Sequence, residues 1–253
     1  EQKGYQVWDL GPQEDYCAII YDLLARRSGD SGRTWQEHAI HKQLPFFAHF
    51  VGRGPLRQLQ DGSLIYFGYG ATAEERVPVK QDPSSTTKNR LHRYGQGRWS
   101  VYCIRSEDLG KTWQAIRAAD GRLSPLAYGF SETFPIINSN GKIFVLLRTG
   151  LGSHAYSISS ADGGRTWTKA VQTPIQAKHP LPTLLRDGTI VCSYQRRFAP
   201  PFGVRARFTS DYGKTWTEES VLRDDIPLSD ALAEPTTVEL ADGKKIEGGD
   251  EES

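Results

Sequence analysis

The chain has 253 residues with a net charge of +1, and it contains 25 Gly, 14 Pro and 11 Tyr. This turn-rich and aromatic composition, without a convincing amphipathic helix, indicates an all-β protein of one domain. The near-zero net charge gives no reason to expect nucleic acid or an anionic membrane as a partner, and no apolar run is long enough to span a bilayer.

One short pattern recurs four times along the chain. It reads Ser/Thr-x-Asp-x-Gly-x-Thr-Trp and occupies residues 28–35, 106–113, 160–167 and 209–216. In such a turn the Asp is expected to accept hydrogen bonds from backbone N–H groups two residues further on. The Gly is expected to adopt the left-handed conformation, and the Trp to cover the hairpin equally in all four copies. We therefore interpret the four Asp residues as structural.

A second kind of turn alternates with the first. Asp-Gly or Asn-Gly pairs, which are strong hairpin signals, occur at residues 61–62, 140–141, 187–188 and 242–243. Two alternating hairpins predict units of four antiparallel strands. Complete units are expected at residues 53–117, 132–171 and 179–222, and partial units at residues 16–42 and 234–247.

Four-stranded units of this length, repeated radially, are typical of a β-propeller. The whole chain, residues 1–253, is therefore predicted to form a single propeller domain. The polar residues 244–253 predict that the last unit is incomplete. Residues 71–98 form a polar insertion between the second and third strands of one unit, and we expect them to overhang the centre of the propeller as a lid.

The three cysteines, Cys17, Cys103 and Cys192, all lie in predicted strands and lack the spacing of metal ligands. We interpret them as buried thiols, with at least one unpaired because their number is odd. The sequence predicts no metal ion and no other cofactor.

Ionisable residues recur at one position of four successive units. Counting eight residues back from each tight turn gives Arg53, Glu132, His179 and Glu234, and each is followed within three residues by a proline. Inner strands of a propeller begin at its central funnel, where ligands bind. We predict that these four side chains converge there; the alternative is that they are ordinary exposed strand starts.

Arginines follow the second strands of the same units. Arg148 lies eight residues after its turn, Arg197 follows the corresponding strand of the next unit, and Arg205 and Arg207 alternate on the strand after it. Since guanidinium groups form two-pronged hydrogen bonds with carboxylates, they favour a site for an acidic ligand. The alternative is that these arginines are paired with the neighbouring glutamates.

The four boxes and the residues between them resemble the sialidase superfamily of Asp-box β-propeller glycosidases, over residues 16–222. The resemblance implies a six-bladed propeller and hydrolysis of terminal, acidic sugars. It implies that Glu132 is the base beside the nucleophile and that Arg148 binds a substrate carboxylate together with Arg205, for which Arg197 and Arg207 are rivals.

The resemblance also implies an acid/base residue ahead of the first box, at Asp15, or at Glu14 if the alignment shifts. Where the family has a tyrosine nucleophile at the start of an inner strand, this chain has Glu234. Because Asp-box glycosidases are often exported, a secreted or periplasmic location is expected.

Three functions therefore remain open. The first is a retaining glycosidase of sialidase type, with a carbohydrate substrate. The second is a related glycosidase that acts on a different sugar with Glu132 and Glu234 as acid and nucleophile. The third is a non-catalytic propeller that binds glycans or proteins, in which Glu132, Arg148 and Glu234 would be paired with one another.

Overall fold

The fold was analysed in a computed structural model, which describes residues 7–8, 18–19, 24–39, 46–75, 98–124, 129–149, 154–196, 200–225, 236–239 and 245–248. These residues are almost entirely strands and turns, with two short 3-10 helices, η2 (Ala73–Glu75) and η3 (Gly121–Leu123). No helix in the described part of the chain has the length and apolar character needed to cross a membrane.

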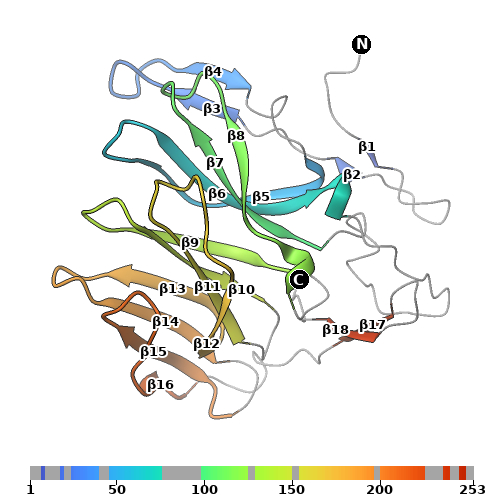
Figure 1. The fold of residues 1–253 in the computed structure, drawn as a ribbon, viewed down its shortest axis with the longest axis vertical. Coiled ribbons are helices and arrows are strands. Elements are labelled where there is room, and N and C mark those ends of the chain that lie inside the picture. The colour runs from blue at the N-terminus through green and yellow to red at the C-terminus, as the bar shows by residue number, and fades with distance from the viewer. Residues whose placement is uncertain are drawn as a thin grey trace.

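Three antiparallel sheets of four strands make up most of the described structure (Figure 1), and in each one the strands are ordered as in the sequence. The first contains β5 (Phe46–Gln58), β6 (Leu64–Thr72), β7 (Ser100–Ser106) and β8 (Gln114–Ala119). The second contains β9 (Ser131–Ile137), β10 (Ile143–Arg148), β11 (His154–Ser160) and β12 (Val171–Gln176). The third contains β13 (Lys178–Leu184), β14 (Ile190–Arg196), β15 (Gly203–Thr209) and β16 (Ser220–Arg223).

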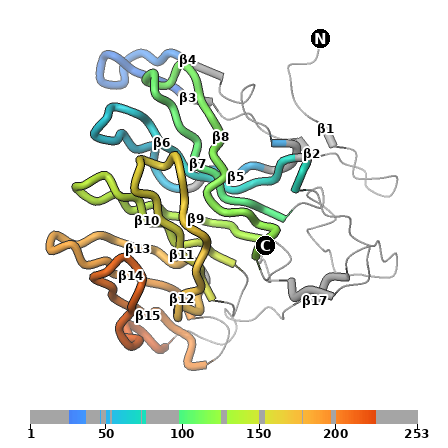
Figure 2. Tube along the Cα trace, in the orientation of Figure 1, coloured from blue at the N-terminus to red at the C-terminus, as the bar shows by residue number. Residues whose placement is uncertain are grey.

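Three shorter sheets are hairpin-like pairs: β1 (Val7–Trp8) with β2 (Ala18–Ile19), β3 (Leu24–Arg27) with β4 (Gln36–Ala39), and β17 (Thr236–Glu239) with β18 (Lys245–Gly248). Figure 2 shows the sheets from β3–β4 to β13–β16 side by side in chain order, a propeller-like arrangement.

Three of the Asp boxes form the hairpins between the third and fourth strands of the four-stranded sheets, and the first box joins β3 to β4. In the second box Asp108 Oδ1 accepts a hydrogen bond from the Thr112 backbone N–H at 2.8 Å, and Oδ2 accepts one from the Thr112 hydroxyl at 2.6 Å. The other three boxes repeat both bonds. The carboxylate thus binds the residue four positions on, not two as expected.

The reason is that two successive residues of each box have a positive φ, for example Leu109 at 58° and Gly110 at 89°. This double left-handed turn brings the threonine around to the carboxylate. A bond to the N–H two residues on occurs instead in the tight turns, where Asp61 binds Ser63 and Asp187 binds Thr189.

The four box tryptophans share a hydrogen bond from Nε1 to the carbonyl oxygen of the box glycine. Their burial differs, contrary to expectation: Trp113 is 5% exposed and Trp35 is 59% exposed. Trp113 packs with Tyr102 and Ile104 on a four-stranded sheet, whereas Trp35 belongs to the two-stranded sheet of β3 and β4.

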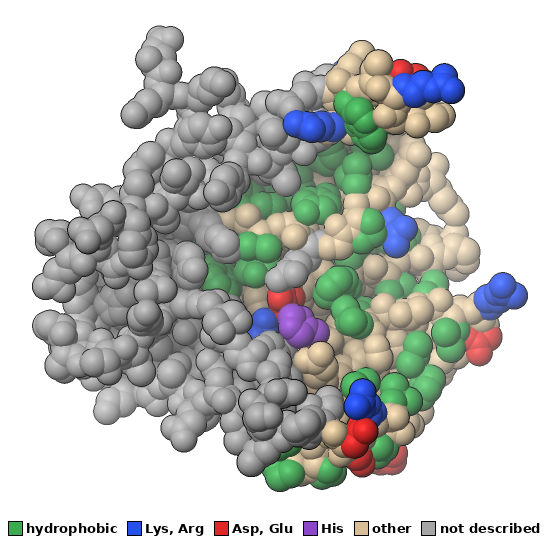
Figure 3. All heavy atoms as spheres, turned by 180° about the vertical axis from the view of Figure 1, so that it is seen from behind, with side chains coloured by type: hydrophobic (Ala, Val, Ile, Leu, Met, Phe, Trp, Pro, Cys, Tyr) green, Lys and Arg blue, Asp and Glu red, His purple; other side chains and the backbone are tan. Residues whose placement is uncertain are grey.

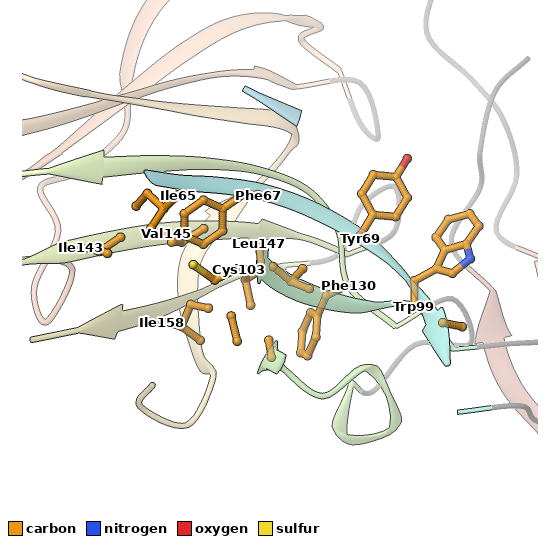
Figure 4. Close-up of a cluster of buried hydrophobic side chains, with 14 of the residues drawn as sticks. Ile65, Phe67, Tyr69, Trp99, Cys103, Phe130, Ile143, Val145, Leu147 and Ile158 are labelled. Carbon is orange, nitrogen blue, oxygen red and sulfur yellow. The ribbon is translucent and has the colours of Figure 1, made fainter. Parts of the chain in front are cut away.

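The core lies between the sheets rather than within one of them. Alternate residues of β10 point to opposite faces, and both faces are buried. Val145 and Leu147 pack with Phe67 of the first sheet, in the cluster drawn in Figure 4, while Phe144 and Leu146 pack with residues of the third sheet. Each sheet is therefore stabilised by its neighbours.

Two of the three cysteines lie in the described residues, and both are buried and free. Burial raises the pKa of Cys103 to about 12 and raises that of Cys192 as well. Both groups are therefore neutral thiols at ordinary pH, as expected of packing residues. Cys17 lies outside the described residues.

Candidate functional site

The site lies at one end of the second and third sheets, where the first strand of each begins. Glu132 is the second residue of β9, and Arg148 is the last residue of β10. In the antiparallel ladder Arg148 is paired with Ser131, so the start of β9 and the end of β10 are side by side. The two side chains thus leave the sheet at the same edge.

Glu132 and Arg148 form a buried ion pair. Arg148 Nη1 donates a hydrogen bond to Glu132 Oε2 at 2.9 Å, and only 5% of the glutamate side chain and 7% of the arginine side chain are exposed. A buried charge is tolerated when an opposite charge compensates it and hydrogen bonds satisfy it. The pair therefore fixes a negative and a positive group at a definite position at the end of the sheets.

His179 joins this pair from the third sheet. It is the second residue of β13, and its Nδ1 lies 2.8 Å from the same Glu132 oxygen, Oε2. Strand β13 packs against both β9 and β10, which brings the imidazole to the carboxylate across the boundary between two sheets. The three residues, Glu132, Arg148 and His179, are called the Glu–Arg–His cluster below.

The backbone at His179 is unusual for a strand residue. Its φ is 53°, in the left-handed region, and the pairing of β13 with β14 shifts register between Lys178 and Leu181. Such a conformation at a residue other than glycine costs on the order of 1 to 3 kcal/mol. The following Pro180 further restricts the backbone conformations that are open to His179. Bulges of this kind redirect a side chain. Here the imidazole is turned to Glu132.

A second irregularity lies at Arg148, where the register of β10 with β9 shifts between Leu147 and Arg148. The guanidinium group is not fully satisfied: its Nε is buried and has no hydrogen-bond partner among the residues that the structure describes. A buried donor without an acceptor is costly, by roughly 1 to 3 kcal/mol. An acceptor atom of a ligand would remove this cost.

The cluster is exposed on the histidine side only. The side chain of His179 is 37% exposed, several times more than those of its two partners. Figure 3 shows a histidine side chain at the surface of this face with an acidic and a basic side chain next to it. A ligand would therefore meet the imidazole first, with the ion pair behind it.

Arg205 lies in a separate polar cluster. Its guanidinium group is 1% exposed and pairs with Glu219 and Asp224, and it also donates to the carbonyl oxygens of Arg223 at 2.7 Å and Pro201 at 3.0 Å. Arg205 thus connects β15 to β16 and to the residues that flank β16. A carboxylate ligand at Arg205 would have to compete with two acidic side chains.

The remaining predicted site residues are only partly described. Arg53 lies inside β5, seven residues after its first residue, and so does not open a strand as expected; the register with β6 shifts between Arg53 and Arg57. Its side chain, and all of Asp15, Arg197 and Glu234, lie outside the described residues. So do Glu14 and most of the insertion at residues 71–98.

A buried glutamate that the repeat register did not single out lies at the start of that insertion. Glu75 accepts hydrogen bonds from the Thr72 backbone N–H at 2.7 Å and from the Tyr102 hydroxyl at 2.8 Å, and it pairs with Arg117 Nε at 2.9 Å. These three partners of the carboxylate all belong to the first sheet. No repeat or motif marks Glu75, because the insertion breaks the repeat there.

Within the described part of the chain, no group of three His, Cys, Asp or Glu side chains is placed to hold a metal ion. The cluster itself offers one carboxylate and one imidazole, and the Arg148 guanidinium directly beside them repels cations. The chemistry of this donor set is that of hydrogen bonding, proton exchange and anion binding.

Antiparallel four-stranded sheets with Asp-box hairpins, packed face to face, define a class of β-repeat protein. Residues 7–181 match the family model of the BNR repeat-like domain, and the chain belongs to this family. A sequence comparison with curated proteins gave no match.

Solved structures with a similar fold include the NanB sialidase from Streptococcus pneumoniae, which is 12% identical with a TM-score of 0.50; the likeness covers 82% of this chain and 47% of that one. The Hadza microbial sialidase Hz136 is 19% identical, with a TM-score of 0.49 and coverage of 79% and 37%. A protein of unknown function from Dyadobacter fermentans DSM 18053 is 22% identical, with a TM-score of 0.45 and coverage of 83% and 74%. The chain spans less than half the length of the two sialidases.

Proposed function

We propose that this protein is a sialidase-like glycoside hydrolase that acts on terminal, acidic sugars at the Glu–Arg–His cluster. The observation that carries the proposal is the buried Glu132–Arg148 pair, 2.9 Å apart at the start of an inner strand, with an exposed imidazole against it. Membership of the BNR repeat-like family supports a carbohydrate ligand.

The preference for an acidic sugar rests on Arg148. Its Nη1 is used by Glu132, while its buried Nε has no acceptor among the described residues. A sugar carboxylate would supply that acceptor and a second negative charge for the guanidinium group. Arg197 and Arg53 remain proposed substrate ligands, and Asp15 and Glu234 proposed catalytic residues.

Hydrolysis of three fluorogenic glycosides tests this proposal: a sialoside, a glucuronide and an arabinofuranoside. We expect release of the fluorophore from at least one acidic sugar and none from the neutral arabinofuranoside. Glu132→Gln should abolish that release in a protein that stays folded, while Glu107→Gln, at an exposed box residue, should leave it unchanged. Cleavage of the arabinofuranoside alone would contradict the role of Arg148.

The same ion pair favours a second candidate, a propeller that binds glycans without cleaving them. Mutual pairing of Glu132 and Arg148 is what a purely structural or binding role predicts. Turnover separates the two candidates. Binding of sialylated or uronic-acid glycans by titration calorimetry, without release of any fluorophore by wild-type protein, would favour the binding function.

A further inference from the structure

The geometry of His179 points to a role that goes beyond ligand contact. We propose that His179 is the catalytic base of the cluster, that Glu132 orients it, and that the glycoside is cleaved by direct attack of a water molecule. This proposal rests on the proposed hydrolase function and gives it a mechanism that differs from a retaining one.

The contact with Glu132 fixes the tautomer of His179. An ionised carboxylate only accepts hydrogen bonds, so at 2.8 Å from Glu132 Oε2 the His179 Nδ1 must carry the hydrogen. The positive Arg148 Nη1 on the same oxygen favours the ionised form of this carboxylate. In the neutral ring, Nε2 then holds a lone pair and can accept a proton.

The second nitrogen of the His179 ring is open to a ligand. Nε2 of His179 has no hydrogen-bond partner among the described residues, and 37% of this side chain is exposed. Glu132 and Arg148 are almost completely buried behind it. A carboxylate that orients an imidazole, with the second ring nitrogen directed to the reactants, is the general arrangement of an activated base.

The backbone at His179 is strained. His179 keeps a left-handed φ of 53° immediately before Pro180, within a bulge of β13. Backbone strain of this kind persists where surrounding contacts determine it, and it is concentrated at functional sites. The bulge places His179 Nδ1 against Glu132. The same bulge therefore accounts for both the backbone strain at His179 and the orientation of its ring.

The proposed reaction is a single displacement by water. One O–H bond of water breaks and its proton passes to Nε2, while the water oxygen bonds to the anomeric carbon and the glycosidic C–O bond breaks. The leaving oxygen takes a proton from solvent. The imidazolium then releases its own proton to solvent, so that the ring returns to its starting state. A single displacement by water inverts the anomeric configuration.

The tautomer can be measured without any substrate. Long-range ¹H–¹⁵N NMR correlations of the wild-type protein, at a pH where the rings are neutral, should show His179 with its hydrogen on Nδ1. In Glu132→Gln this fixed tautomer should be lost. His154, whose Nδ1 lies 2.8 Å from the Thr173 carbonyl oxygen, is an internal control that should not change. A wild-type His179 with its hydrogen on Nε2 would overturn the proposal.

Kinetics on the sugar that wild-type protein cleaves provides the second test. His179→Gln should lower kcat by about 10²- to 10⁴-fold, as loss of a general base does, with a much smaller change in KM. His154→Gln should leave kcat unchanged. NMR of the first-formed product should show the inverted anomer. Full activity of His179→Gln, or a retained anomer, would show that His179 is not the base.

Failure of the two proposals can be told apart. If wild-type protein cleaves none of the three glycosides, the hydrolase proposal fails, and with it the role of His179 as a base. If it cleaves one of them while His179→Gln is unimpaired, the hydrolase proposal stands and only the assignment of the base fails.

Discussion

Trp167 of the third Asp box packs edge-on against Phe67 of the preceding sheet, with ring centroids 5.6 Å apart and ring planes at 90°. The box therefore contacts two sheets, its own and the one before it. The same box also receives a hydrogen bond from the preceding sheet, from Arg105 to the Gly163 carbonyl oxygen at 2.6 Å. The Asp boxes are thus contacts between sheets as well as turns within them.

Trp167→Ala should consequently lower the free energy of unfolding, but by less than the roughly 3 to 5 kcal/mol that loss of a fully buried aromatic side chain costs, because Trp167 is half-buried at this boundary. Trp35→Ala is the matched control: Trp35 occupies the same box position but is 59% exposed, so its loss should cost far less. Urea denaturation of both variants measures the difference. Ligand affinity of folded Trp167→Ala should be unchanged; a loss of binding would place the box at the site.

Arg148→Lys should weaken binding of an acidic sugar by on the order of 1 to 3 kcal/mol, because the lysine ammonium keeps the charge but not the planar set of donors. Titration calorimetry with the sugar acid and its methyl ester measures this. Wild-type protein should bind the ester about as weakly as the variant binds the acid.

The free energies of unfolding of two Arg148 variants distinguish the contribution of its charge from that of its hydrogen bonds. Arg148→Met leaves the buried Glu132 without its guanidinium partner and should lower the free energy of unfolding by about 3 to 5 kcal/mol. Arg148→Lys should cost less. Equal affinities of the lysine variant and wild type for the sugar acid would remove Arg148 from its proposed role.

Tyr102→Phe should destabilise the first sheet, because its hydroxyl donates to the fully buried Glu75 at 2.8 Å. Burial, and secondarily the charge of Glu75, raises the pKa of Tyr102 to about 12, so the hydroxyl keeps its hydrogen at ordinary pH. Because the lost hydrogen bond is to a charged group, the free energy of unfolding should decrease by about 1.5 to 3 kcal/mol, as measured by urea denaturation. The control Tyr156→Phe removes only a 3.3 Å contact with Gln172 at the surface and should change little.

Acid should weaken the fold through the Asp boxes. The Thr112 hydroxyl lowers the pKa of Asp108 from 3.8 to about 2, and the Thr215 hydroxyl lowers that of Asp211 equally. Since the folded pKa lies below the unfolded one, the stability that these bonds contribute is present above pH 4 and is lost as the pH falls toward 2.

Removal of both hydroxyls tests this origin of the acid sensitivity. The double variant Thr112→Val/Thr215→Val should be less stable than wild type at pH 6. Its urea midpoint should then fall less steeply between pH 4 and 2, because the two carboxylates titrate closer to their usual pKa. Parallel curves for wild type and variant would show that the boxes do not cause the acid sensitivity.

The sequence was sufficient to predict the sheets because their turns have strict requirements. Only residues tolerant of a positive φ close a tight turn, so pairs such as Asp61-Gly62 mark hairpins in any context. Two turns in each unit also determine the order of its strands. The family resemblance is shown separately, by the match over residues 7–181.

The site was predictable only as far as the repeat register extends. Equal spacing from the turns marked Glu132 and His179 as corresponding residues, and antiparallel pairing explains why Arg148 lies beside Glu132. The contact from His179 to Glu132 depends on a bulge and a left-handed residue before a proline, for which the sequence has no rule. The role of each residue remains a prediction.

The burial of individual side chains was the feature that the sequence predicted least well. Identical boxes contain Trp113, which is buried, and Trp35, which is exposed, because burial depends on which strands lie next to the box and not on the box itself. The buried position of Arg205 is set in the same way, by Glu219 and Asp224, which lie directly before and directly after the neighbouring strand β16.

The packing of each box on the sheet before it also gives the array a direction. Tyr212, in the fourth box, covers Phe144 of the second sheet and accepts a hydrogen bond from Asn138, as Trp167 in the third box covers Phe67 of the first. During synthesis each sheet would leave the ribosome with one apolar face bare, and the next repeat to emerge would cover it. A chain stalled after β12 would present Phe144 to solvent and to chaperones, whereas the first sheet would already be shielded by the second.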